Sequence, residues 1–268
     1  MTAATQPAPA LAPHVSPVEG LRQTATLAWR TLVQVRHNPW ELGDFSFQPI
    51  MFVLLFTFVF GGAIAGDTGD YLQFALPGIV MMNAVFITMY TGLGLNTDVT
   101  KGVFDRLRSL PIARWAPLTG RIAADLVKQA WSVALLLVVG YVLGFRVTTN
   151  FWGVLGMFAL VLLFSLAFSW VSVLVGLLAR DPEHVQLFSF TALFPVTFVS
   201  SVFVPAATMP GWLQSWVKIN PVSYLSEAAR GMLVGGPVAG PTLRAILWAA
   251  LIAAVFAPLS AWAFKRRV

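Results

Sequence analysis

Charged side chains that could pair with a partner protein are concentrated in one stretch, DVTKGVFDRLRSLPIARW, at residues 98–115. Its four cations are Lys101, Arg106, Arg108 and Arg114. An apolar edge at i, i+1, i+4 and i+7 accompanies them, formed by Val103, Phe104, Leu107 and Leu110, and Pro111 ends the helix. A solvated loop does not need such an edge. The pattern is typical of a short amphipathic helix that docks into a groove of another protein.

Chemistry that requires a thiol, a metal or a nucleotide has little support in this sequence. Cysteine is absent, which excludes disulfides, thiolate metal sites and a cysteine nucleophile. The histidines His14, His37 and His184 include no i, i+4 pair of the kind that holds a metal on a helix. The sequence contains neither a G-x-x-x-x-G-K-[ST] phosphate loop nor a G-x-S-x-G elbow. We therefore expect no metal and no cofactor in this chain, and we disfavour a membrane-embedded enzyme.

The elements that must position the charged stretch are apolar helices. The chain is 57% hydrophobic and 10% charged, whereas a soluble domain carries about 25% charged residues. A bilayer core of about 30 Å requires about 20 helical residues. Six segments meet this requirement: 47–65, 72–96, 117–144, 151–178, 185–204 and 243–264. We expect an all-α integral membrane protein with six transmembrane helices.

The distribution of cations predicts the orientation of the chain, because Lys and Arg accumulate on the cytoplasmic side. With the N-terminus inside, only Arg146, Lys218, Arg230 and Arg244 of the 17 cations face outward. Both termini are then cytoplasmic. The net charge of +6 is explained by this orientation, and we expect no nucleic-acid partner. Six of the ionised groups within residues 98–121 would alone cost on the order of 18 kcal/mol in the bilayer, so this hairpin is also cytoplasmic.

Two further regions lie outside the six spans. Residues 1–18 are rich in Ala and Pro and are expected to form a disordered tail. Residues 19–40 are expected to form an amphipathic interfacial helix, followed by a transmembrane domain at 41–268. The helical stripe consists of Leu21, Ala25, Ala28, Leu32 and Val35, with Trp29 and Trp40 as interfacial anchors. A plain juxtamembrane helix is an equally good interpretation.

The outward segment between the fifth and sixth spans is divided by prolines into two short helices. One contains Trp212 and Trp216, and the other runs from about Pro221 to Leu233. Both are too short to cross the bilayer and are expected to be re-entrant or to pack on the outer leaflet. Glu227 and Arg230 are three apart and are expected to form an ordinary ion pair rather than a substrate contact. Asp125 and Lys128 have the same spacing and the same structural interpretation.

Two motifs resemble those of one family, the daunorubicin-resistance membrane subunits within the type-2 class of ABC exporters. The hairpin motif matches at Asp98, Lys101, Gly102, Asp105, Arg106, Arg108 and Pro111, followed by Gly120, Arg121 and Asp125. The outward motif NPVSYLSEAARGMLVGG matches at Asn220, Pro221, Val222, Glu227 and Arg230, although the family commonly has Asp at the position of Glu227. The resemblance covers residues 19–268.

The resemblance implies a permease subunit in the bacterial cytoplasmic membrane that pairs with a separate ATPase subunit. Two copies of each would form one exporter, most simply with a permease homodimer, and the partner would bind ATP and Mg. Residues 98–112 would contain the coupling helix seated in the ATPase. Phe104 and Leu107 would be the buried anchors of that joint, with Arg106 and Arg108 at its rim. Arg106 has an alternative role, a bond to Asp105 or to a helix-end carbonyl within the hairpin.

Candidate substrate contacts are much less specific. The resemblance points to amphipathic drugs of the anthracycline kind or to lipids, and does not distinguish between them. Bulky side chains in the second, fourth and fifth spans would suit such compounds. The candidates are Met81, Phe86, Tyr90, Phe168 and Phe190. Contact with membrane lipid and ordinary helix packing explain these residues at least as well.

The main alternative function is ion-gradient-driven secondary transport of hydrophobic compounds. Such a transporter usually shows internal repeats, paired interrupted helices and acids near the bilayer midplane. The first three predicted spans do not resemble the last three, and Asp125 is the one acid expected at any depth. We therefore favour ATP-driven transport. A purely structural scaffold is disfavoured by the docking hairpin, which indicates a moving part.

Overall fold

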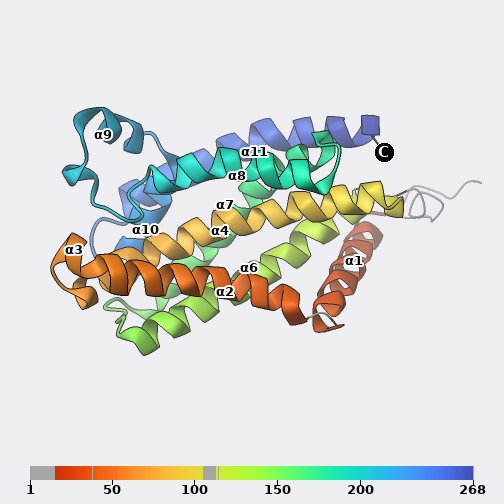
Figure 1. Cartoon of the computed structure of the whole chain (residues 1–268). Helices are drawn as coiled ribbons and strands as arrows, with labels where there is room; N and C mark the ends of the chain where they lie inside the picture. The colour runs from red at the N-terminus through yellow and green to blue at the C-terminus, as the bar shows by residue number, and fades with distance from the viewer. Residues whose placement is uncertain (1–15, 38, 105–112, 114, 268) are drawn as a thin grey trace, which may run out of the picture.

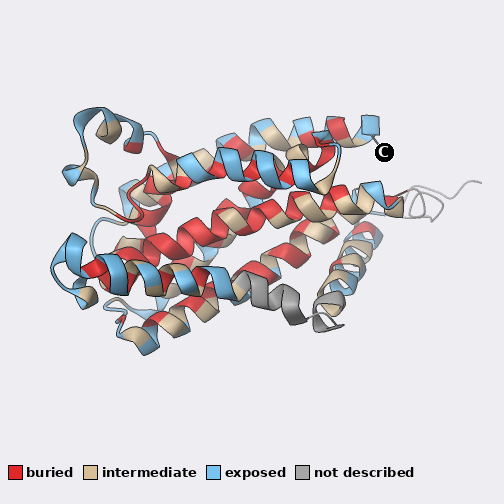
Figure 2. Ribbon diagram, in the orientation of Figure 1, coloured by how far each residue is buried: buried red, intermediate tan, exposed pale blue. Residues whose placement is uncertain are grey.

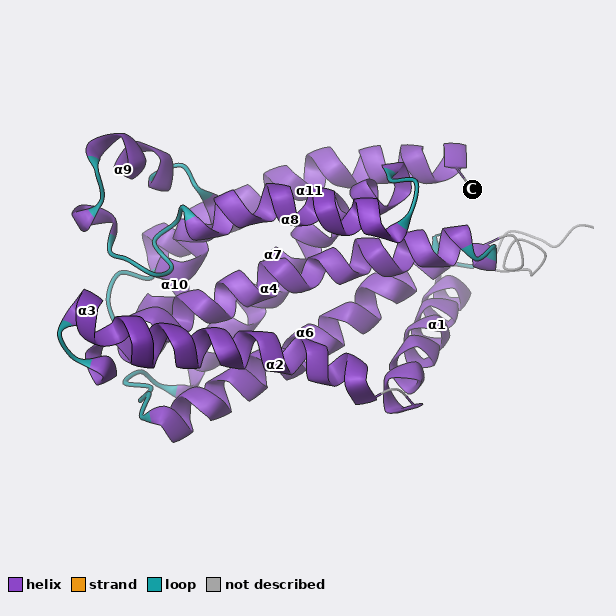
Figure 3. Cartoon of the chain, in the orientation of Figure 1, coloured by secondary structure: helices purple, strands orange, loops and turns teal. Residues whose placement is uncertain are grey.

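The computed structural model describes residues 16–37, 39–104, 113 and 115–267, and all regular elements within them are helical (Figures 1 and 3). The long helices are α1 (Pro17–His37), α2 (Pro39–Leu55), α4 (Thr68–Thr100), α6 (Ala116–Leu143), α7 (Phe151–Leu178), α8 (Pro182–Phe198) and α11 (Ala239–Arg267). The shorter ones are the π-helical η1 (Phe56–Phe60), α3 (Gly61–Ala65), the 3₁₀ turn η2 (Ala206–Thr208), α9 (Gly211–Val217) and α10 (Pro221–Val234). The predicted all-α class is confirmed.

Five helical runs are long and apolar enough to cross a membrane. They are Ser46–Ala65, Thr68–Thr100, Ala116–Leu143, Phe151–Leu178 and Ala239–Arg267. They coincide with the first, second, third, fourth and sixth predicted spans. Within the described residues the chain is therefore a multi-pass membrane protein with five such helices, and the predicted count of six is not reached.

The fifth predicted span, 185–204, is shorter than the sequence suggested. Helix α8 ends at Phe198, three residues after Pro195. Its 17 residues reach about 26 Å at 1.5 Å per residue, which is slightly less than the bilayer core. Proline lacks a backbone donor and disturbs the turn before it, but α4 and α11 continue past Pro77 and Pro258, so Pro195 alone does not explain this helix end. Residues 199–205 continue without regular helix.

Helix α4 forms the centre of the bundle. It contacts α7, α10, α8, α6 and α2, and it is coloured as buried along most of its length in Figure 2. Asp67 begins it by accepting hydrogen bonds from the backbone N–H groups of Gly69 and Asp70 at 2.7 and 3.0 Å. The main core around α4 includes Leu76, Met81 and Phe164.

Helix α1 packs across the start of α6 at one end of the bundle (Figure 1). A Cβ on Gly120 would lie 2.9 Å from the Cβ of Leu27, so the two helices approach closely. Leu21 and Trp29 are exposed on α1, as expected for a face turned toward lipid. The predicted helix at 19–40 is thus present as Pro17–His37, while its place at the membrane surface stays a prediction.

Candidate functional site

The charged hairpin leaves the bundle at the end of α4. Lys101 is exposed and follows the last residue of that helix, and Gly102 turns the chain with a left-handed φ of 66°. The predicted coupling residues Asp105, Arg106, Leu107, Arg108 and Pro111 lie outside the described residues. The chain is described again at Ala113, whose backbone N–H donates to the Gln23 side chain of α1 at 2.8 Å.

Phe104, a predicted anchor of the coupling helix, packs against other helices of this chain. Its side chain is buried within this chain, with 6% of its surface exposed. The ring meets that of Phe264 edge to face at a centroid distance of 5.3 Å. Around it lie Leu95, Leu118 and Ile122. Phe104 therefore anchors the hairpin to its own bundle, while its expected contact with an ATPase subunit stays a prediction. Helical periodicity identifies an apolar edge without showing which surface covers it.

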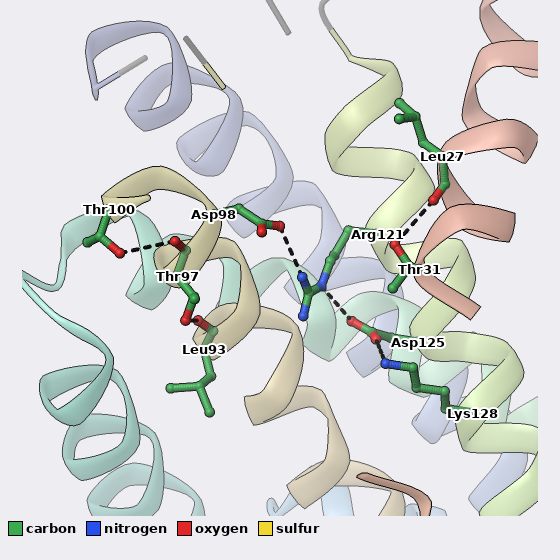
Figure 4. Close-up of polar contacts among 9 residues, drawn as sticks. All are labelled: Leu27, Thr31, Leu93, Thr97, Asp98, Thr100, Arg121, Asp125 and Lys128. Carbon is green, nitrogen blue, oxygen red and sulfur yellow. Dashed lines mark hydrogen bonds and ion pairs between the residues drawn. The ribbon is translucent and has the colours of Figure 1, made fainter. Parts of the chain in front are cut away.

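Below the hairpin, four charged residues connect α4 to α6 (Figure 4). Arg121 Nη1 lies 3.0 Å from Asp98 Oδ2, and Arg121 Nε lies 3.6 Å from Asp125 Oδ2. Lys128 Nζ lies 3.4 Å from Asp125 Oδ1, which confirms the expected pairing. The link from Arg121 to Asp98, 23 residues away, was not predicted. We call these four residues the inner charge cluster.

Gly94 makes room for this arrangement. A Cβ at this position would overlap the guanidinium group of Arg121. Gly94 is one helical turn before Asp98 on α4, so Arg121 crosses α4 at the glycine to reach the carboxylate. The sequence contains a recognisable pattern here, a glycine four residues before an acid. The role of Gly94 becomes clear only from the way α6 packs on α4.

On the opposite end of the bundle, Asn220 joins α8 to α10. Its Oδ1 accepts from the backbone N–H of Val222 at 2.8 Å and so caps α10, where Pro221 is the first helical residue. Its Nδ2 donates to the carbonyl oxygens of Val196 and Val199 at 2.7 and 2.8 Å. One buried side chain thus satisfies donors and acceptors at two helix ends.

Arg230 has different partners from the predicted one. Its Nε donates to the carbonyl of Phe74 at 2.8 Å, and its Nη2 donates to that of Ser201 at 2.7 Å. Its guanidinium carbon lies 3.9 Å from the ring centroid of Phe74. Burial lowers the pKa of Arg230 to about 10, against the raising effect of the Glu227 carboxylate. Arg230 supports the irregular backbone after α8 rather than forming a direct ion pair with Glu227.

Three of the five candidate substrate residues lie near one another. Phe86 and Tyr90 line a groove between α2 and α4, and the ring of Phe190 lies 6.1 Å from that of Phe86. Met81 and Phe168 are buried in the main core, so the structure separates them from this group.

The same face carries a row of aromatic rings that sequence reasoning missed. Consecutive centroids are 4.1 to 6.1 Å apart. The row runs through Phe52, Phe56, Phe203, Phe198, Phe194, Phe190 and Phe86. It joins α2 and η1 to α8 and α4, and Phe190 and Phe194 are exposed at its α8 side.

The long apolar helices define the class as a multi-pass membrane protein. The chain belongs to the ABC-2 type transporter family, whose model matches residues 22–234. It is 38% identical over 244 residues to the daunorubicin resistance ABC transporter permease protein DrrB1 of Streptomyces coeruleorubidus, covering 91% of this chain and 86% of that one. It is 29% identical over 224 residues to the probable doxorubicin resistance ABC transporter permease protein DrrC of Mycobacterium tuberculosis, covering 81% and 79%.

Proposed function

We propose that this chain is the membrane-spanning permease subunit of an ATP-driven exporter of amphipathic drugs, with lipids as the alternative cargo. The observation that carries the proposal is the family match together with the 38% identity to a daunorubicin resistance permease over most of both chains. The face with Phe86, Tyr90 and Phe190 supports a flat aromatic cargo, because stacked rings favour such groups. Its place in the bacterial cytoplasmic membrane follows from the same match.

ATP and Mg are bound by a separate ATPase subunit in this proposal, since the sequence has no phosphate loop. The segment from Asp98 to Pro111 is its docking element. Phe104 fixes the root of the hairpin inside the bundle, and the following residues, Asp105 to Arg108, make the contact. Closure of two ATPase subunits would then move two hairpins, one in each permease copy of a homodimer.

The membrane topology completes the proposal. In this proposal the cytoplasmic end of the bundle is the one where α1, the end of α4, the start of α6, the α7–α8 turn and the C-terminal end of α11 lie together in Figure 1. Helix α8 forms the sixth crossing together with residues 199–204. Irregular backbone is tolerated at membrane depth only where protein satisfies it. Arg230 and Tyr71 supply such bonds to Ser201 and Phe203. Helices α9 and α10 are the re-entrant outer segment.

Co-purification of the ATPase subunit from solubilised membranes tests the proposal. The tagged chain should retain the ATPase, and the double variant Leu107→Ala with Arg108→Ala should retain at least about tenfold less, because it removes the expected buried anchor of the joint together with one charge at its rim. Lys218→Ala, which removes an exposed cation from the opposite end, is the matched control and should have no effect. Absence of any nucleotide-binding subunit from the unmodified complex would refute the proposal.

A further inference from the structure

Helix α4 is held against α7 by direct backbone contact. A Cβ on Gly92 would overlap the carbonyl of Ser172, and a Cβ on Gly176 would overlap the carbonyl of Gly92. Small residues of this kind allow two membrane helices to pack at short range over a wide area. Thr88 and Ser172 add a hydrogen bond between their hydroxyl groups at 3.2 Å.

The cytoplasmic-side end of α7 is also fastened to its neighbours. The last carbonyls of a helix lack partners within the helix. Here Asn96 of α4 donates to those of Gly176 and Ala179 at 2.9 and 3.0 Å. Arg267 of α11 donates to the carbonyls of Leu177 and Ala179. These bonds join α4, α7 and α11 into one unit.

The opposite leg of the hairpin belongs to a second unit. The hydroxyl groups of Thr24 on α1 and Thr119 on α6 lie 3.2 Å apart. Gln23 of α1 accepts from the backbone of Ala113, and Gly120 lets Leu27 approach α6 closely. Helices α1 and α6 would thus move together if the hairpin were displaced.

The surface between these two units also has apolar packing, since a Cβ on Gly140 of α6 would overlap the side chain of Leu76 on α4. It differs from the α4–α7 contact in the charged and amide side chains that lie along its middle and at one end. Arg121 contacts Asp98 near the hairpin end of α4 and α6. Deeper in the bundle, Asn83 Nδ2 donates to Ser132 Oγ at 2.9 Å. Between them Gln129 is buried on α6, and both of its amide atoms are without a hydrogen-bond partner among the described residues. A buried amide without a partner weakens the contact that contains it.

We propose that this α4–α6 surface is the joint that slips during transport, and that Arg121 positions it by exchanging between Asp98 and Asp125. This inference rests on the proposed function. It adds which part of the bundle moves: α6, together with α1, slides against the unit of α4, α7 and α11. The guanidinium already lies between the two carboxylates, at 3.0 and 3.6 Å. A slide of up to one helical turn, about 5.4 Å, therefore keeps the cation paired throughout. Because Gly94 has no side chain, the guanidinium group of Arg121 has room to move past α4 at this position.

Paired cysteines test the joint directly, since the native chain has no cysteine. The seam pair is Asn83→Cys with Ser132→Cys, and the matched control is Thr88→Cys with Ser172→Cys across α4 and α7. Each is reconstituted with the ATPase subunit and closed with a short, reducible bifunctional thiol reagent, and the cross-linked fraction is measured in the same sample. ATP-dependent transport should fall at least tenfold in the cross-linked seam pair and return on reduction. The control should keep its rate.

Continued transport by the cross-linked seam pair would overturn the proposal, and so would an equal loss in the control. If the seam variant is inactive before cross-linking, Asp125→Asn decides the matter, because Asp125 pairs with Arg121 and lies outside the docking segment. The proposal then expects ATP hydrolysis to persist while transported substrate per ATP falls at least threefold, with Glu183→Gln as a control at the same end. An unchanged transport ratio, or an equal fall of hydrolysis and transport, would refute it. Absence of ATP-dependent transport in the unmodified complex would instead refute the proposed function.

Discussion

At the scale of single residues, the chain places its scarce polar groups where two or more elements meet. Arg121, Asn220 and Arg230 each bond to groups far away in the sequence. The sequence marked all three positions through charge, spacing and family motif. It suggested Glu227 as the partner of Arg230, because the i, i+3 rule describes one helix only. The carbonyls that Arg230 satisfies come from α4 and from the end of α8, which no local pattern can supply.

Gly94→Ala should disturb transport without unfolding the protein. The new Cβ would displace the flexible end of Arg121 and weaken its bond to Asp98. A charge-assisted bond of this kind contributes about 1.5 to 3 kcal/mol, so the transport rate should fall about tenfold or more. Gly62→Ala is the control, since a Cβ there meets nothing within 4 Å. Equal transport rates for the two variants would show that the position of Arg121 is unimportant.

Asn220→Ala should destabilise the fold by about 2 to 4 kcal/mol, because a helix cap is lost and two buried carbonyls lose their donor. Asn220→Ser should regain about 1 kcal/mol of this by restoring the cap. The measurement is the free energy of unfolding in mixed micelles by detergent titration, followed through the fluorescence of the 10 tryptophans. Identical values for Asn220→Ala and the unmodified chain would contradict the assigned bonds.

At the scale of elements, hydropathy predicted five of the long helices to within a few residues, and the two short outward helices as well. The burial of Phe104 and the position where α8 ends could not be predicted from hydropathy. The apolar edge at Phe104 was visible, but its burial against Phe264 depends on where α11 packs. The end of α8 depends on Asn220 and Arg230 satisfying the unwound segment, in addition to Pro195.

Single-cysteine labelling tests whether α8 crosses the membrane. Glu183 lies in the first turn of α8 and Ala207 follows the helix, and both are exposed. In intact cells an impermeant thiol reagent should label Ala207→Cys and leave Glu183→Cys unlabelled until the membrane is permeabilised. Labelling of both from the same side would show that α8 does not cross and that the chain has an odd number of spans.

At the scale of the whole molecule, the two units joined at the α4–α6 surface explain how a small hairpin could shift a large bundle. Phe86 of the aromatic row lies on the α4–α7–α11 unit that we expect to stay fixed. The other rings of the row come from α2, η1, α8 and the segment after α8. Helix α2 also contacts α6, so a slide of α6 would open or close the groove beside Phe86. This relation between the charged end and the aromatic face could not be predicted from residue types, because it depends on which helices share contacts.

The most direct test of the central claim is the accumulation of daunorubicin in inverted membrane vesicles that contain this chain and its ATPase subunit. Export from the cell corresponds to uptake by such vesicles. We predict uptake that requires ATP, is blocked by vanadate, persists when a protonophore removes the ion gradient, and disappears when the ATPase subunit is omitted. Uptake that proceeds without the ATPase subunit and is abolished by the protonophore would contradict the account.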